Sequence, residues 1–203
     1  MRLADQIEYK PKKIYNQGTL PNCSAFAYLG ALTENVEQEF GVEVEFDIVA
    51  EYNKMRASKI DKTFIERFTE IGKTDGFKSI DGKYLVKVEG VTKVPAMFLN
   101  AVRTELQEKG TLVWTIWLYP NYSLTKHDKD LRLMSLPVTA KRTAKTHAMF
   151  IAGYDKDKGF KFYNSWGTSQ ALYVDFETFK MLSKGLSIYS FDKISINGTG
   201  SDV

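Results

Sequence analysis

The sequence has very little cysteine and histidine. Its 203 residues include one cysteine, Cys23, and two histidines. A single cysteine excludes an internal disulfide, which favours a reducing compartment or a thiol that is kept for its chemistry. The three side chains are far apart in the sequence and lack the spacings of structural zinc sites. We therefore expect no metal and no other cofactor.

Long apolar runs and dense basic clusters are also missing. No stretch approaches the roughly 20 apolar residues that span a bilayer, and the N-terminal MRLADQIEYKPKK lacks the apolar segment of a signal peptide. The net charge is only +3, and no basic run is long enough to indicate a phosphate-binding surface. We expect a cytoplasmic protein that binds neither membranes nor nucleic acid.

Helical patterns dominate the first half of the chain. Apolar residues recur at three- and four-residue spacing after Cys23, with Asn22 as a candidate N-cap and Gly41 as a candidate stop. Further helices are expected over 45–58 and over 95–108, before Gly110.

From Gly110 onward the pattern changes to short segments rich in aromatic and β-branched residues, separated by turn signals. These expected strands are 111–119, 147–155, 159–167 and 171–176. A helical half followed by a strand-rich half indicates an α+β protein with two lobes, and a cleft between such lobes is a usual place for a substrate.

Cys23 lies at the start of the first expected helix, in the segment QGTLPNCSAFAYLG. The positive end of a helix dipole favours a thiolate, but a free thiol with a pKa of about 8.5 still needs a base for efficient attack. His147 begins an apolar strand, where a charged imidazole requires a partner, whereas His127 lies in a charged segment. His147 is therefore the better candidate base.

Asn164 is the candidate that orients His147. It ends the next expected strand, and an antiparallel pair joined by the DKDKG turn would bring it back beside His147. Taken singly, a buried cysteine, a core histidine and a turn asparagine each have a structural interpretation as well.

These residues, in this order, resemble the papain-like cysteine proteases. His147 and Asn164 follow Cys23 by 124 and 141 residues, near the 130–150 typical of that family. The matching positions are Gln17-Gly18, Cys23, Ala25-Phe26, His147, Gly153-Tyr154 and the Asn-Ser-Trp-Gly motif that begins at Asn164.

The resemblance implies a papain-like α+β fold, with a helical lobe, a β-barrel-like lobe and the active-site cleft between them. We expect one domain over 1–196, in which about 14–109 form the helical lobe and about 110–196, together with 1–13, form the strand-rich lobe. The small polar residues 197–203 are expected to be a flexible tail.

The resemblance also implies a thiol peptidase that cleaves peptide bonds through a thiolate–imidazolium pair and a thioester. Cys23 would attack the carbonyl, His147 would pair with the thiolate and protonate the leaving amine, and Asn164 would orient His147. Gln17 would stabilise the oxyanion together with the Cys23 N–H, and Trp166 would cover the His–Asn hydrogen bond.

Several positions beside the nucleophile depart from the family pattern. Asn22 and Ser24 replace the usual serine and tryptophan, and the usual glycine-rich substrate strip has no clear counterpart, Gly76 being the nearest candidate. We expect Asn22, Ser24, Trp166 and Gly76 to line or support the cleft. The departures also leave room for another Cys–His acyl transfer, or for an inactive assembly protein such as a phage or host-interaction component.

The segment before Cys23 is short. Only 22 residues precede it, whereas secreted family members usually carry a long inhibitory pro-segment. We therefore expect a chain of the shorter bacterial or bacteriophage type, restrained by its compartment, by a regulatory or assembly partner, or by narrow specificity. Its substrate would be a peptide or protein, met in the cytoplasm, or in a virion or host cytoplasm if the chain is phage-encoded.

Overall fold

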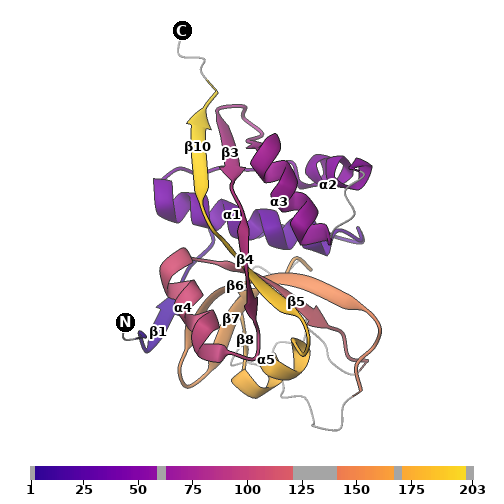
Figure 1. Ribbon diagram of the computed structural model, residues 1–203, viewed down its shortest axis with the longest axis vertical. Helices are drawn as coiled ribbons and strands as arrows, with labels where there is room; N and C mark the ends of the chain where they lie inside the picture. Colours follow the sequence, from indigo (N-terminus) through magenta and orange to yellow (C-terminus); the bar gives the residue numbers. More distant parts are fainter. Residues whose placement is uncertain (1–2, 59–62, 121–140, 167–170, 200–203) are drawn as a thin grey trace.

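The computed structural model describes residues 3–58, 63–120, 141–166 and 171–199. Figure 1 shows two lobes along the long axis, one in which helices pack with a small sheet and one built on a larger sheet. The helices are α1 (Cys23–Phe40), α2 (Ile48–Ala57), α3 (Phe64–Thr74), α4 (Leu99–Lys109) and α5 (Phe176–Leu182). The chain is an α+β protein, as the sequence predicts.

The strands of the described residues form two antiparallel sheets. The small sheet has the order β10 (Ile194–Gly198), β3 (Tyr84–Val88), β2 (Phe77–Lys78). The large sheet has the order β4 (Val91–Pro95), β9 (Ser187–Phe191), β5 (Leu112–Trp117), β6 (Thr146–Asp155), β7 (Gly159–Tyr163), β8 (Leu172–Val174), and β1 (Gln6–Glu8) pairs with β6.

The expected helix after Cys23 is confirmed as α1. It is capped by Gly41, which donates its N–H to the Glu37 carbonyl and turns the chain out of the helix with a positive φ of 68°. Asn22 precedes the helix as expected, but its side chain makes no capping hydrogen bond. The expected helices over 45–58 and 95–108 are confirmed as the shorter α2 and α4.

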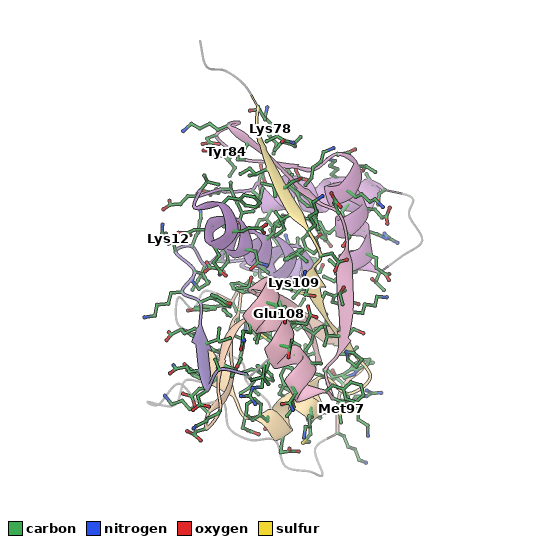
Figure 2. All side chains as sticks on the ribbon, turned by 60° about the vertical axis from the view of Figure 1, so that its left-hand side comes forward. Lys12, Lys78, Tyr84, Met97, Glu108 and Lys109 are labelled. Carbon is green, nitrogen blue, oxygen red and sulfur yellow. The ribbon has the colours of Figure 1, made fainter. Side chains whose placement is uncertain are left out.

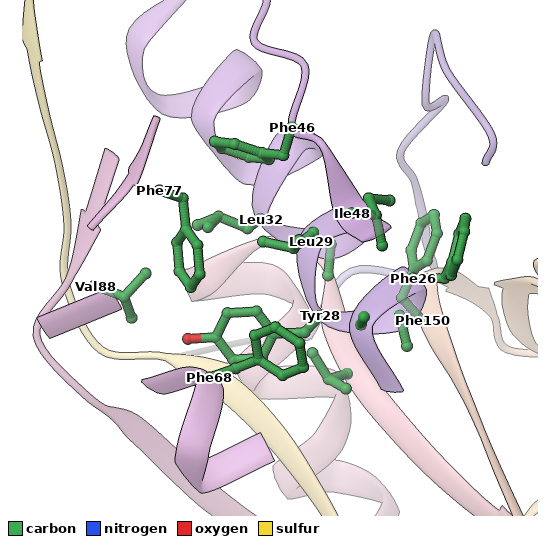
Figure 3. Close-up of a cluster of buried hydrophobic side chains, with 14 of the residues drawn as sticks. Phe26, Tyr28, Leu29, Leu32, Phe46, Ile48, Phe68, Phe77, Val88 and Phe150 are labelled. Atoms are coloured by element: carbon green, nitrogen blue, oxygen red, sulfur yellow. The ribbon is translucent and has the colours of Figure 1, made fainter. Parts of the chain in front are cut away.

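The core of the helical lobe surrounds α1 (Figure 3). Tyr28 stacks on Phe68 of α3 with ring centroids 5.4 Å apart, and Phe77 of β2 packs against both rings. On the side toward the large sheet, a Cβ at Gly30 would lie 3.1 Å from the Phe150 ring, so α1 rests closely on β6. The helix that begins at Cys23 is thereby fixed against the strand that carries His147.

The large sheet contains the four expected strands as β5, β6, β7 and β8, with slightly different limits. Its end strands β4 and β8 do not pair with each other, so the described strands form an open sheet and not the β-barrel-like lobe that the sequence led us to expect. Among the described strands, β4 pairs only with β9, and β8 pairs only with β7. The sequence pattern of a strand does not encode which other strand it pairs with.

The expected boundary near residue 109 does not coincide with the packing of β4 and α4. Strand β4 and helix α4 belong to the large sheet, because Val94, Val102 and Leu106 share a core cluster with Trp114. Figure 2 shows α4 on that lobe, with exposed Met97 near its start and Glu108 and Lys109 at its other end. In this part of the chain, the packing of the helical lobe therefore ends before β4.

The C-terminal strand also crosses between the lobes. Strand β10 pairs with β3 of the small sheet, and Asn197 and Gly198 lie opposite Leu85 and Tyr84. The expected tail therefore begins in a paired strand. In the part of the chain that the structure describes, no helix combines the length and the apolar character needed to cross a membrane.

Candidate active site

Cys23 is the first residue of α1 and is partly buried against the large sheet. Burial raises the pKa of its thiol, and hydrogen bonds from the backbone N–H groups of Ala148, Ser24 and Cys23 itself partly offset that effect. Because Ala148 directly follows His147 on β6, the contact places the sulfur beside the strand that carries the candidate base.

His147 lies near the start of β6 and is only 3% exposed. Its Nε2 atom is 2.8 Å from Oδ1 of Asn164. An amide oxygen only accepts, so Nε2 carries the proton and Nδ1 of the neutral ring is left as an acceptor. The expected β6–β7 hairpin, with Asp155 opposite Gly159, brings the two side chains together.

The His147 ring is shielded from solvent. Trp166 covers it, with ring centroids 4.2 Å apart and planes inclined by 33°. Burial lowers the pKa of His147 to about 4, and the hydrogen bond with Asn164 partly offsets this by favouring the charged ring. Burial thus favours the uncharged form of Cys23 and of His147 alike.

Gln17 is tied to the segment that follows Asn164. Its backbone N–H donates to the Ser165 carbonyl at 2.8 Å, and its Oε1 accepts from the Ser165 hydroxyl at 2.5 Å. One hydrogen of its side-chain amide is donated from Nε2 to the Leu20 carbonyl at 2.8 Å. The amide group has a second hydrogen, which this bond does not use.

Cys23 and His147 line the same pocket, which has a volume of about 410 Å³. Among the described residues that line this pocket, His147 alone carries an imidazole, carboxylate or basic group. Apart from Cys23, the other described lining residues are apolar or carry a hydroxyl group. The lining residues are Pro21, Cys23, Ser24, Thr63, Phe64, Ile65, Thr115, Thr146, His147, Ala148, Leu186, Ser187 and Tyr189.

The other expected cleft residues have different positions. Ser24 lines the pocket, whereas Asn22, Trp166 and Gly76 do not. Asn22 is 1% exposed, and its Oδ1 has no hydrogen-bond partner among the described residues. Gly76 lies in the turn between α3 and β2, where its N–H donates to the Ile71 carbonyl. His127 and the final glycine of the Asn-Ser-Trp-Gly motif lie outside the described residues.

Several pocket residues were not expected from the sequence. Thr63, Phe64 and Ile65 come from the start of α3, and Leu186 and Tyr189 come from the region of β9. The Thr-x-x-Glu spacing at Thr63 is a capping-box signal that would have identified α3. No local signal indicates that β9 returns to the cleft. Within the described ranges, no group of three or more His, Cys, Asp or Glu side chains could hold a metal ion.

Sequence comparison and structure comparison give different results. No protein-family model matches the chain, and no curated protein matches it in sequence. Solved structures match well. Xylellain, a cysteine protease from Xylella fastidiosa, superimposes with a TM-score of 0.71 at 13% identity, over 98% of this chain and 88% of that one.

Two further structures extend the comparison. The cysteine protease and lectin-like domains of Cwp84, a surface-layer-associated protein of Clostridium difficile, match with a TM-score of 0.73 at 13% identity, over 96% of this chain and 53% of that one. Digestive procathepsin L 3 of Tenebrio molitor matches with a TM-score of 0.70 at 11% identity, over 94% of this chain and 70% of that one. The chain therefore has the fold of papain-like cysteine proteases.

Proposed function

We propose that the protein is a cysteine peptidase in which Cys23 is the nucleophile, His147 the base, and Asn164 the group that orients the base. The supporting observation is one arrangement: Cys23 and His147 line a common pocket, and His147 donates its Nε2 proton to Asn164 at 2.8 Å. The fold shared with xylellain and procathepsin L 3 agrees with this chemistry.

The proposed reaction has two halves. Nδ1 of His147 takes the thiol proton, and the sulfur attacks the carbonyl carbon of the substrate. The tetrahedral intermediate places its oxyanion near the Cys23 N–H and the unused amide hydrogen of Gln17. It then collapses to a thioester as the imidazolium protonates the leaving amine. Water, deprotonated by His147, releases the acid and restores the thiol.

The electrostatics favour transfer of the proton within the pair. Burial opposes a lone thiolate and a lone imidazolium, but transfer from Cys23 to His147 leaves the net charge unchanged. The N-terminus of α1 and the Ala148 N–H favour the thiolate, while Asn164 favours the imidazolium. The two charges therefore stabilise each other where neither is stable alone.

Peptides or proteins are the proposed substrates, with an uncharged side chain entering the pocket. A chain with one cysteine is suited to a reducing compartment such as the cytoplasm, which we propose as its site of action.

The test is covalent labelling followed by turnover. A peptidyl epoxide should modify Cys23 of the folded protein near neutral pH, and a library of fluorogenic peptides should contain cleaved members. Cys23→Ala should abolish both, and His147→Ala should slow both. A wild-type protein that reacts no faster than a free thiol and cleaves no peptide contradicts the proposal.

A second candidate function is a protein that keeps the fold for binding or assembly. It is favoured by the effect of burial, which stabilises the uncharged forms of both Cys23 and His147. In that case labelling would rise with pH in a single step at or above the ordinary thiol pKa. A bell-shaped profile with an acidic limb would favour the peptidase.

A further inference from the structure

The start of α3 is held by a capping box at the edge of the pocket. The Thr63 hydroxyl accepts from the Glu66 N–H at 3.4 Å, while Glu66 Oε2 accepts from the Thr63 N–H at 3.0 Å and from its hydroxyl at 2.8 Å. This arrangement fixes the first turn of the helix, which presents Phe64 and Ile65 to the pocket.

The Glu66 carboxylate also forms an ion pair with a residue of the other lobe. Glu66 Oε1 accepts from Nζ of Lys93 on β4 at 2.5 Å. Lys93 lies opposite Tyr189 in the β4–β9 ladder, and Tyr189 lines the pocket. Burial raises the pKa of Tyr189, and a hydrogen bond with the Thr63 side chain partly offsets this. Thr63, Glu66, Lys93 and Tyr189 thus form a closed set of contacts across the two lobes.

These contacts join two elements that contribute separately to the pocket. Phe64 and Ile65 come from α3, and Ser187 and Tyr189 come from β9. Helix α3 belongs to the helical lobe, and β9 belongs to the large sheet. The distance across the pocket between the α3 residues and the β9 residues therefore depends on the contacts that hold the start of α3 to the large sheet.

We propose that the Glu66–Lys93 ion pair is a positioning clamp that sets how large an uncharged side chain the pocket accepts beside Cys23. The inference rests on the proposed function, in which the pocket holds a substrate side chain. Lys93 and Glu66 act through α3 and Tyr189, because neither is among the lining residues of the pocket.

The expected effect is modest. Lys93 is 51% and Glu66 27% exposed at the side chain, and solvent-exposed ion pairs are weak. Loss of such a pair corresponds to a change of roughly two- to fivefold in a binding or rate constant. The clamp is therefore visible as a change in selectivity between substrates, with little change in global stability.

The experiment compares two peptidyl epoxides that differ in one side chain, phenylalanine or alanine, at the position directed to the pocket. The second-order rate constant for Cys23 alkylation is measured with each, and iodoacetamide gives the reference rate. Lys93→Met and Glu66→Gln should each change the phenylalanine-to-alanine ratio by about two- to fivefold. Lys93→Arg, which keeps the charge, should restore the wild-type ratio.

A matched control ion pair is available between the segments that connect β3 to β4 and β9 to β10. Lys193 pairs with Glu89 at 2.6 Å, both are exposed, and neither lines the pocket, so Lys193→Met should leave the ratio unchanged. Added salt should move the wild-type ratio toward the Lys93→Met value and leave that variant unaffected.

Two results would overturn the clamp, and they have different meanings for the site. If the wild type discriminates between the epoxides and Lys93→Met and Glu66→Gln keep its ratio, the clamp is wrong and the peptidase proposal stands. If the wild type reacts with both epoxides no faster than a free thiol does, the pocket is not a side-chain site, and the clamp fails together with the proposed function.

Discussion

His147 donates through Nε2 to Oδ1 of Asn164 at 2.8 Å, beneath the ring of Trp166. The bond fixes the tautomer in which Nδ1 is the acceptor, and the tryptophan keeps water away from it. Burial disfavours the charged ring, so a negative partner would stabilise the imidazolium, and Cys23 lines the same pocket.

Removal of the Asn164 side-chain amide should slow the alkylation of Cys23. We expect Asn164→Ala to lower the rate of Cys23 alkylation by about 10- to 100-fold, the effect of losing a hydrogen bond to a charged group. The measurement is the rate of epoxide labelling with the melting temperature recorded in parallel. Asn164→Asp, which still accepts from His147, is the control and should retain more reactivity on a profile displaced to higher pH. Equal rates in all three proteins would show that the bond does not orient the base.

The protonation of His147 should depend on the presence of Cys23. In Cys23→Ala no thiolate can form, so the imidazole pKa should be about 4. In the wild type the thiolate–imidazolium pair should raise the imidazole pKa above that value. Both can be followed by the ring proton resonances in an NMR titration. The same pKa in the two proteins would contradict the pairing.

The same shift makes stability depend on pH in Cys23→Ala. The folded pKa of about 4 is below the ordinary value of about 6.5, so the unfolded chain binds the proton more tightly. The contribution of neutral His147 to the free energy of unfolding is therefore fully present above pH 6.5. It is lost as the pH falls toward 4, by about 3 kcal/mol in total. Urea unfolding of Cys23→Ala, with and without His147→Gln, measures it. If the difference in unfolding free energy between these two proteins is the same at pH 6.5 and at pH 4, burial does not lower the pKa of His147.

Gln17 should matter for acyl transfer more than for alkylation. Alkylation by iodoacetamide forms no oxyanion, whereas peptide cleavage does. Gln17→Ala should lower kcat/KM for a peptide by about 100- to 1,000-fold, the usual cost of losing an oxyanion donor, with a much smaller effect on alkylation. Ser165→Ala, which frees Oε1 of Gln17 from its hydroxyl partner, should lower kcat/KM by a smaller factor. If Gln17→Ala lowers the rates of peptide cleavage and of alkylation by the same factor, Gln17 positions Cys23 and does not stabilise the oxyanion.

A glycine on β6 should be needed for the attachment of β1. A Cβ at Gly153 would collide with the backbone carbonyl of Ile7, and backbone cannot rotate away as a side chain can. We expect Gly153→Ala to destabilise the fold by about 1–3 kcal/mol, as overpacking does, with loss of protection in β1 by hydrogen exchange. Gly198→Ala is the control, because nothing lies within 4 Å of its added Cβ. Two variants of equal stability would contradict the close approach.

Local sequence patterns were sufficient to predict the elements that carry Cys23, His147 and Asn164. The apolar spacing after Cys23 predicts α1, and alternation with a DKDKG turn predicts the β6–β7 hairpin that brings Asn164 to His147. These features depend on neighbours in the chain, so periodicity and turn residues are enough. The same patterns missed α3, although Thr63 and Glu66 carry a capping-box signal for it.

The sequence by itself determined the α+β class, the helix that begins at Cys23, and the order of the residues that resemble a papain-like active site. Only the tertiary structure decided that β4 pairs into the large sheet and α4 packs on it, that the described strands leave this sheet open, and that α3 and β9 both line the pocket. The physical reason is that these features depend on strand pairing and side-chain contacts between distant segments. An example is Lys93 with Glu66, whose energy depends on three-dimensional proximity and leaves no periodic trace in the chain.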